Sequence, residues 1–526
     1  MFNMSKLAHI KVVNKKYNIF TSIRAPSKTP VDEFASFSPL FNTTYAIKDN
    51  FTTRNEPTTC SSLMLSNYKS PFDSTVVTLL NQSGSQCIGK TNMDEFGMGN
   101  STTSSYFGPT LNSLYPQTEN LFIDYEEVIF STKDIGDENG EFISSDIVEG
   151  IKEGYTVNKY YVPKLNRDEK GKVIFNNIDS RQRITGGSSG GSATAVGLDL
   201  VDFAIGSDTG GSVRLPACYN NIYGFKPTYG RISRWGLVAY AQSLDTVGIM
   251  SKEVDTIWKV FSTLDLADSK DPTSLSDSCR EEIAIERINS KKNVGKKFKI
   301  GIPIEYKFNE LSEDIKQSWE KLLNKLKENK LIEIIPISIP SVKYSLPAYY
   351  TLVTSEASSN LSRYDGNRYG FRTEDYEGEE PEFRFNRDKA FGEEVKRRIL
   401  LGNYSLSSYG YDNNYKKASN VRRLLIEEFN KVFRDKHCLM EKKQLTNANG
   451  IDLMIVPTSV NLPKLINEGN GDIVEGYMND VCTIPMSLAG LPTMNIPFEN
   501  FGFQIVGQHG QDYKVLEFTR LVNNIL

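Results

Sequence analysis

Two glycine- and serine-rich segments have residue types that could perform catalysis or bind a ligand. Residues 185–193 read TGGSSGGSA, residues 206–214 read GSDTGGSVR, and a short apolar run lies between them. Glycines let a backbone turn sharply and bring its N–H groups close to a ligand. The segments could therefore grip a phosphate, act as linkers, or hold a nucleophilic serine, with Ser188 and Ser212 as the candidates.

The phosphate and linker interpretations both fit poorly. A phosphate-binding P-loop needs a lysine followed by a hydroxyl residue after its glycines, and neither segment supplies that lysine. A flexible linker would be out of place between a predicted strand and a predicted helix. The pattern therefore favours loops that position a nucleophilic serine.

Ser212 is the better-placed nucleophile. We expect a strand to end before it, the chain to turn at Gly210 and Gly211, and a helix to begin at Ser212. The backbone N–H groups of Thr209, Gly210, Gly211 and Ser212 could then converge on a developing oxyanion. One such donor is worth roughly 10²–10³ in rate.

A serine nucleophile also needs a base, and histidine is scarce in this chain. The three histidines, at positions 9, 437 and 509, are all remote in sequence from the serines. A lysine can substitute when burial lowers its pKa from about 10.4. Lys48 follows apolar Ala46 and Ile47, and Ser188 could relay the proton from Ser212 to it. Alone, Lys48 would be interpreted as a surface lysine, but the combination of residues favours a base.

Strand and helix patterns alternate around these residues, which predicts an α/β fold with its functional residues on loops. No linker divides the chain, so residues 1–526 are expected to form one large domain. Strands are expected at 44–50, 86–90, 201–205, 298–304 and 451–456, and helices at 74–82, 191–197, from 212, 315–327, 393–401 and 421–433. Residues 481–497 and 503–506 are expected to close the domain.

Residues 117–180 interrupt this alternation. They hold 14 acidic against 7 basic residues and show little apolar periodicity. We expect them to form an acidic, mobile insertion that is solvated and has no function of its own.

Composition limits the classes of function. The net charge of −4 gives no reason to expect nucleic-acid binding over the whole surface, and no apolar run is long enough to span a bilayer. Six cysteines without a CxxC pair argue against a zinc site and a disulfide framework, and suit a reducing compartment. Residues 1–31 are basic and lack acidic residues, which is typical of a mitochondrial transit peptide or of a basic helix within the fold.

Four motifs, AIKDN, GGSSGGSA, GSDTGGSVRLPA and GFKPTYGR, together resemble the amidase signature family. The resemblance implies one domain with a central mixed, twisted β-sheet covered by helices on both faces. It also implies a Ser–cis-Ser–Lys triad, in which Ser212 is the nucleophile, Ser188 the cis-bonded relay and Lys48 the base. Ser189 would support the relay by hydrogen bonding, and no metal is implied.

Further motifs are similar to the glutaminase chains of glutamyl-tRNA(Gln) amidotransferases, a branch of that family with mitochondrial members. They are GKTNMDEFGMG (89–99), KPTYGRISRWGLVAYAQSLD (226–245), YYTLVTSEASSNLSRYDGNRYGFR (349–372), FGEEVKRRILLG (391–402) and YMNDVCTIPMSLAGLP (477–492).

The branch resemblance implies that the substrate is glutamine. Its α-carboxylate would be held by Arg398 and its α-ammonium by Asp480, with Tyr349 as a further contact. The alternatives are an Arg398–Glu394 pair one helical turn apart, an N-cap role for Asp480, and a core position for Tyr349.

The resemblance also implies an assembly. The chain would need no cofactor, and ATP and Mg²⁺ would be used by a partner, the amidotransferase B chain, with a small third chain completing a heterotrimer. Transfer RNA would be engaged through the complex. The mitochondrial matrix is the expected location, with the cytoplasm as the alternative. Two other functions stay open: a stand-alone amidase acting on another amide, and a non-catalytic assembly component.

Overall fold

The computed structural model describes residues 2–26, 36–54, 56–133, 155–169, 171–175, 177–291, 297–306, 311–373, 381–440, 447–468 and 473–526. The chain folds into two compact units. Unit 1 comprises Met1–Ile205, Trp235–Val238 and Ser362–Lys396, and unit 2 comprises Gly206–Arg234, Ala239–Leu361 and Arg397–Leu526. Both units combine a mixed β-sheet with helices, which confirms the predicted α/β class.

Unit 1 is built on strands in the order β6-β2-β3-β1-β5-β4. Strands β6, β2 and β3 run parallel, and β1, β5 and β4 add antiparallel neighbours. The bounds are β1 Phe20–Arg24, β2 Thr44–Lys48, β3 Gln86–Thr91, β4 Tyr125–Lys133, β5 Tyr155–Pro163 and β6 Phe203–Asp208. The helices are α1 (Met4–Tyr17), α2 (Thr75–Gln82), α3 (Gly190–Gly197) and α9 (Glu382–Ala390).

Unit 2 has strands in the order β10-β9-β11-β13-β12-β7-β8. Strands β10, β9 and β11 run parallel, and the remaining neighbours are antiparallel. The strands are β7 Tyr223–Lys226, β8 Thr246–Ser251, β9 Phe298–Pro303, β10 Ile332–Ile337, β11 Leu453–Pro457, β12 Thr493–Phe498 and β13 Phe501–Val506.

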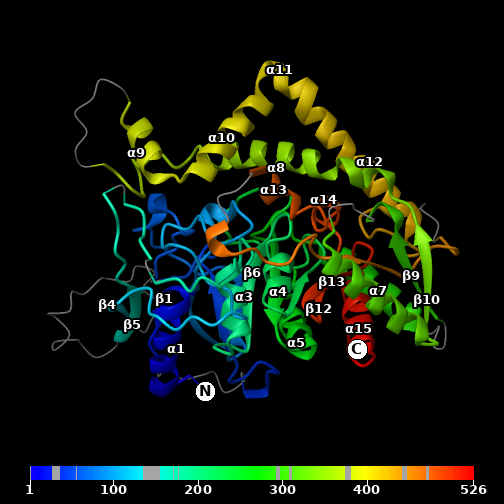
Figure 1. Ribbon diagram of the computed structural model, residues 1–526, viewed down its shortest axis with the longest axis horizontal. Helices are drawn as coiled ribbons and strands as arrows, with labels where there is room; N and C mark the ends of the chain where they lie inside the picture. The colour runs from blue at the N-terminus through cyan, green and yellow to red at the C-terminus, as the bar shows by residue number, and fades with distance from the viewer. Residues whose placement is uncertain are drawn as a thin grey trace. The chain divides into compact units, whose positions relative to one another are not determined.

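The helices of unit 2 include two long ones, α8 (Ser345–Leu361) and α12 (Lys416–Val432), which pack side by side (Figure 1). The others are α4 (Arg214–Tyr219), α5 (Val254–Leu264), α6 (Asp277–Lys291), α7 (Glu313–Glu328), α11 (Ser408–Gly410), α13 (Ile473–Met478), α14 (Ile484–Leu488) and α15 (Asp512–Asn523). Helix α10 (Glu393–Leu406) begins in unit 1 and ends in unit 2. None of the helices in the described part of the chain is long and apolar enough to cross a membrane.

The N-terminal segment is an integral part of unit 1. Asn3 caps α1 by accepting a hydrogen bond from the N–H of Lys6. At the other end of the helix, the Asn14 side-chain oxygen accepts hydrogen bonds from the N–H groups of Ile19 (2.6 Å) and Phe20 (2.7 Å). The buried Asn14 side chain therefore fixes α1 to the start of β1, and the basic helix belongs to the fold.

Two expected boundaries are displaced. The strand expected at 201–205 is β6, Phe203–Asp208, and the helix expected from Ser212 begins at Arg214. Ser212 itself lies in the turn before α4. The carboxylate of Asp208 explains the delay, because it accepts hydrogen bonds from the N–H groups of Val213 and Arg214 and closes the turn before the helix starts.

Residues 117–180 contain two strands, so the interpretation of this acidic insertion as a loop is wrong, whereas its lack of a function stays a prediction. Strands β4 and β5 pair over nine residues each, and β5 also pairs with β1. Edge strands exposed to water carry charged residues on their free face, so their apolar periodicity is weak and a composition argument misses them. The middle of the insertion, residues 134–154, lies outside the described residues.

Candidate active site

Lys48 and Ser188 meet in unit 1. Lys48 is the last residue of β2, Ser188 lies in the loop before α3, and both side chains are buried. The Nζ of Lys48 donates a hydrogen bond of 2.7 Å to the Oγ of Ser188. If the amine is neutral, the same contact lets Lys48 accept the Ser188 proton, which is the geometry that general-base catalysis requires. The two residues are 140 positions apart in sequence.

The loop around Ser188 has the backbone that the resemblance implied. The Gly187–Ser188 peptide bond is cis. Gly187 packs so tightly that a Cβ there would lie 2.1 Å from the carboxylate of Asp94. Ser189 is fully buried and is the N-cap residue of α3. Glycine is therefore required at position 187 for the loop to lie against Asp94.

Asp94 organises a second loop that supports the first. Its Oδ2 accepts hydrogen bonds from the N–H groups of Ser101 (3.2 Å) and Thr102 (2.9 Å). Its Oδ1 accepts from the N–H groups of Thr103 and Ser104 and from the Ser104 hydroxyl. Five hydrogen bonds thus converge on one buried carboxylate, which fixes residues 101–104 as a rigid turn.

Thr102 connects that turn to the Ser188 loop. Its hydroxyl donates a hydrogen bond to the carbonyl oxygen of Gly186 (2.8 Å) and accepts one from the N–H of Gly190 (3.0 Å). These two contacts lie on either side of Ser188. The position of the Ser188 hydroxyl therefore depends on Asp94 through Thr102.

Ser212 and the expected oxyanion donors lie in unit 2. Ser212 is half-buried and follows Gly210 and Gly211 in the turn between β6 and α4. Across the described residues, the N–H groups of 209–212 donate no hydrogen bond within the protein. Unpaired donors in this turn could bind the oxygen of a tetrahedral intermediate.

A buried ion pair holds the Ser212 turn. The guanidinium of Arg214 lies 2.9 Å from a carboxylate oxygen of Asp208, and both side chains are fully buried. Arg214 also donates to the carbonyl oxygen of Gly210 (3.2 Å) and to that of Thr483 (2.9 Å). Burial by itself would raise the pKa of Asp208, but the Arg214 charge holds that pKa below its usual value. The pair therefore stays ionised and stabilises the turn, since Asp208 bonds the N–H of Val213 and Arg214 bonds the carbonyl oxygen of Gly210.

A second carboxylate fixes the start of the turn. Thr209 donates its hydroxyl hydrogen to Asp245 over 2.7 Å, and Asp245 also accepts from the N–H groups of Tyr240 and Ala241. Burial raises the pKa of Asp245 to about 6. Asp245 thus joins the Thr209 turn to the loop that carries Tyr240.

Tyr349 packs directly on the Ser212 turn. A Cβ at Gly210 would lie 2.5 Å from the Tyr349 hydroxyl oxygen, and a Cβ at Gly211 would lie 2.3 Å from the hydroxyl of Thr483. Both glycines are therefore needed for this close approach. Tyr349 is buried, as its core alternative also requires, and its hydroxyl end faces Gly210.

Arg398 is a buried cation surrounded by tyrosines. It lies in α10 with its guanidinium carbon 5.5–5.8 Å from the ring centres of Tyr240, Tyr350 and Tyr477. It also donates a hydrogen bond to the hydroxyl of Tyr240. The tyrosine faces stabilise the charge and orient the guanidinium, and its fork geometry suits a carboxylate. Glu394 lies one turn before Arg398 in α10, and a pairing of the two stays a prediction.

Asp480 reaches the same tyrosines from another segment. Its carboxylate accepts a hydrogen bond of 2.8 Å from the hydroxyl of Tyr350. The ring of Tyr350 is tilted against that of Tyr477, with the ring centres 4.2 Å apart. The N-cap position of α14 is occupied by Thr483, whose hydroxyl and N–H both donate hydrogen bonds to the carbonyl oxygen of Asp480. Arg398 and Asp480 thus place opposite charges on one tyrosine cluster, formed by Tyr240, Tyr349, Tyr350 and Tyr477.

Sequence reasoning missed the residues that position the others. The run of hydroxyl residues at 101–105 hints that its N–H groups need an acceptor, which could have identified Asp94. Tyr350 is adjacent to Tyr349 but had no separate signal. Only the fold reveals three further contacts, because their partners are distant in sequence. Arg398 contacts Tyr240 and Tyr477, and Thr209 donates its hydroxyl hydrogen to Asp245.

Comparisons with known proteins identify the family of the chain. A family model described as Amidase matches residues 7–119 and 174–516. The stretch it leaves unmatched, 120–173, contains β4 and β5.

Relatives that match over most of the chain share one name. The mitochondrial glutamyl-tRNA(Gln) amidotransferase A chain of Candida albicans is 40% identical over 493 residues, covering 93% of this chain and 92% of the relative. That of Eremothecium gossypii is 40% identical over 522 residues, covering 98% and 97%. The crystal structure of the glutamyl-tRNA(Gln) amidotransferase A chain from Thermotoga maritima is 30% identical with a TM-score of 0.67, covering 98% of this chain and 88% of that one.

Proposed function

Because the chain belongs to the amidase family, we propose that it is the glutamine-hydrolysing component of a glutamyl-tRNA(Gln) amidotransferase. The observation that carries the catalytic part is the buried 2.7 Å contact between Lys48 and Ser188, because a lysine at a serine hydroxyl replaces the missing histidine base. The ammonia released would convert Glu-tRNA(Gln) to Gln-tRNA(Gln).

The reaction would begin with attack by Ser212 on the side-chain amide carbon of glutamine. The proton of Ser212 passes to Ser188 and on to Lys48, and the N–H groups of residues 209–212 receive the oxyanion. The same relay returns a proton to the departing nitrogen, so that ammonia leaves and a γ-glutamyl ester remains on Ser212. Water then hydrolyses the ester. Lys48 and Ser188 belong to unit 1 and Ser212 to unit 2, so the proton transfer between the serines is itself part of the proposal.

Substrate choice would come from the tyrosine cluster. The guanidinium of Arg398 would bind the α-carboxylate of glutamine in a bidentate manner, and Asp480 would bind the α-ammonium. An α-amino acid presents these two charges close together, and Arg398 and Asp480 both contact Tyr350. Tyr349 would pack beside the reacting carbonyl because it lies against Gly210.

The chain would work within an assembly. The amidotransferase B chain would activate Glu-tRNA(Gln) with ATP and Mg²⁺ and receive the ammonia, and a small third chain would complete the heterotrimer. Transfer RNA would be bound through that complex. The relatives are mitochondrial proteins by name, and the mitochondrial matrix is the location we assign to this chain.

A Ser212→Ala variant of the complex tests whether this chain hydrolyses glutamine while its partner amidates Glu-tRNA(Gln). It is expected to lose glutamine-dependent amidation of Glu-tRNA(Gln) and to retain amidation with added ammonium salts. Loss of both activities in a correctly assembled complex would contradict the proposal.

The second candidate is a stand-alone amidase that shares the triad but acts on another amide. It is distinguished by Arg398→Ala, which should raise the KM for glutamine strongly if the tyrosine cluster binds an amino acid. An unchanged KM would favour the second candidate. Labelling of Ser212 by a glutamine-derived electrophile would exclude a non-catalytic assembly component.

A further inference from the structure

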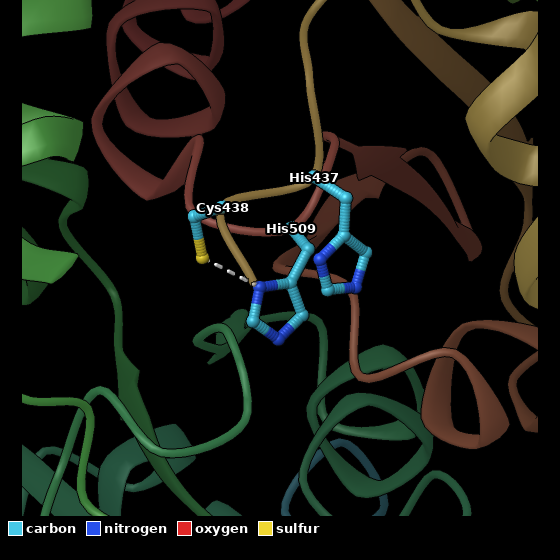
Figure 2. A group of neighbouring side chains, drawn as sticks. All are labelled: His437, Cys438 and His509. Atoms are coloured by element: carbon cyan, nitrogen blue, oxygen red, sulfur yellow. Dashed lines mark hydrogen bonds between the residues drawn. The ribbon is translucent and has the colours of Figure 1, made fainter. Parts of the chain in front are cut away.

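Two of the three histidines in the chain meet a cysteine in unit 2. His437 and Cys438 follow α12, and His509 lies between β13 and α15 (Figure 2). One ligand atom from each residue can be chosen so that all three lie within 4.8 Å of one another. The proposed catalysis uses none of these residues, and nothing in the reaction accounts for their convergence.

The spacing of these atoms is close to that of a bound metal. The Sγ of Cys438 lies 3.0 Å from the Nδ1 of His509, and the two imidazole rings stack with their centres 4.1 Å apart (Figure 2). Zn–S bonds of about 2.3 Å and Zn–N bonds of about 2.0 Å place neighbouring ligand atoms roughly 3.5 Å apart in a tetrahedral site. The two rings are nearly parallel, and an imidazole binds a metal through a lone pair in its own plane. The half-buried His437 ring would therefore have to turn out of the stack for the three atoms to surround one ion.

The cluster is partly open to solvent. His509 is buried and His437 is half-buried.

The backbone brings the two segments together closely. Gly510 has a φ of +93°, and a Cβ at that position would lie 3.2 Å from the Cβ of Cys438. A neighbouring hydrogen bond joins the side chain of Gln508 to that of Asn430 in α12. Cys438 also packs against Cys279 of α6. Ligands on rigid, contacting segments lose little freedom when a metal binds.

We propose that His437, Cys438 and His509 form a Zn²⁺ site, with water as the fourth ligand. Zinc is favoured because it accepts mixed nitrogen and sulfur ligands in tetrahedral geometry. Binding replaces the thiol proton of Cys438, which passes to solvent as the Zn–S bond forms, and no oxidation state changes. The ion would join the segment after α12 to the segment before α15. The absence of CxxC pairs does not exclude this site, because its ligands come from two distant segments.

Titration of the full-length chain with Zn²⁺ against a chromophoric chelator tests the site. One equivalent should bind, and Co²⁺ in its place should give a near-ultraviolet thiolate charge-transfer band. His437→Ala and Cys438→Ser should each weaken Zn²⁺ binding by about 100-fold or more and abolish the Co²⁺ band. His9→Ala, which removes the exposed histidine outside the cluster, should bind as the wild type does.

A stability measurement separates a metal site from a folding defect. Zn²⁺ should raise the Tm of the wild type and of His9→Ala but not that of the two cluster variants, since only a ligand of the folded state stabilises it. His437 is half-buried, so its replacement leaves the core intact. A wild-type chain that binds no Zn²⁺, or a Cys438→Ser variant that keeps the affinity and the Co²⁺ band, would overturn the proposal.

Discussion

Asp94→Asn removes the charge that holds the loop supporting Ser188. The carboxylate accepts three hydrogen bonds at Oδ1 and two at Oδ2. An asparagine keeps one oxygen, and the orientation that loses least keeps the three Oδ1 contacts. The N–H groups of Ser101 and Thr102 then face an NH₂ group and lose their acceptor.

The decrease in the free energy of unfolding follows from the burial of those two N–H donors. Thr102 is fully buried and Ser101 is half-buried. A buried donor left without an acceptor costs about 1–3 kcal/mol, and water partly satisfies the Ser101 N–H. We therefore expect Asp94→Asn to lower the free energy of unfolding by about 2–4 kcal/mol.

The catalytic effect should fall on kcat rather than KM. Thr102 contacts Gly186 and Gly190 on either side of Ser188, whereas the proposed glutamine contacts Arg398 and Asp480 belong to unit 2. A displaced relay slows proton transfer without changing the binding of glutamine, so kcat should fall by about 10- to 100-fold.

Urea unfolding followed by fluorescence, and steady-state glutaminase assays of the complex, measure the two effects. Asp179→Asn is the matched control, because it removes a carboxylate paired with exposed Arg181 at the surface and should change neither quantity. The reasoning is refuted if Asp94→Asn unfolds within about 0.5 kcal/mol of the wild type, a threshold the size of an ordinary surface substitution, or if it raises KM with kcat unchanged.

Two further predictions concern the tyrosine cluster and a buried acid. Tyr350→Phe removes the 2.8 Å hydrogen bond that orients Asp480 and should raise the KM for glutamine by about 3- to 10-fold with little change in kcat. Tyr344→Phe, at an exposed tyrosine, is its control. An unchanged KM in Tyr350→Phe would count against Asp480 as a substrate contact. Glu95 is buried, and desolvation raises its pKa from 4.5 to about 7. The folded state therefore holds its proton more tightly than the unfolded state, so the stability from this group is complete below pH 4.5 and is lost as the pH rises through 7. The loss between about pH 5 and pH 8 is about 2–3 kcal/mol. Glu95→Gln keeps an acceptor for the N–H of Gly392 and should remove this loss, so the variant should be more stable than the wild type at about pH 8 in urea unfolding. An equal pH dependence of the free energy of unfolding in both proteins would refute the attribution of this loss to Glu95.

The sequence alone was enough to predict the chemistry that we propose for the candidate site. Glycines flanking Ser188 and Ser212, a lysine after an apolar pair and the lack of a nearby histidine were enough to predict a serine nucleophile with a lysine base. These signals are local, because the turn preferences of glycine and the spacing of strands and helices depend on a few neighbouring residues. For the same reason β2, β3, α2 and α3 were predicted close to their observed bounds.

Only the tertiary structure decided which side chains hold that chemistry in place. Asp94 reaches the Ser188 loop through Thr102, Asp208 delays the start of α4, and Tyr350 joins Arg398 to Asp480. The convergence of His437 and Cys438 with His509 likewise has no sequence signature. Each of these contacts joins residues whose separation along the chain carries no periodic signal. They form because buried polar groups must find partners wherever the packing of the fold supplies them.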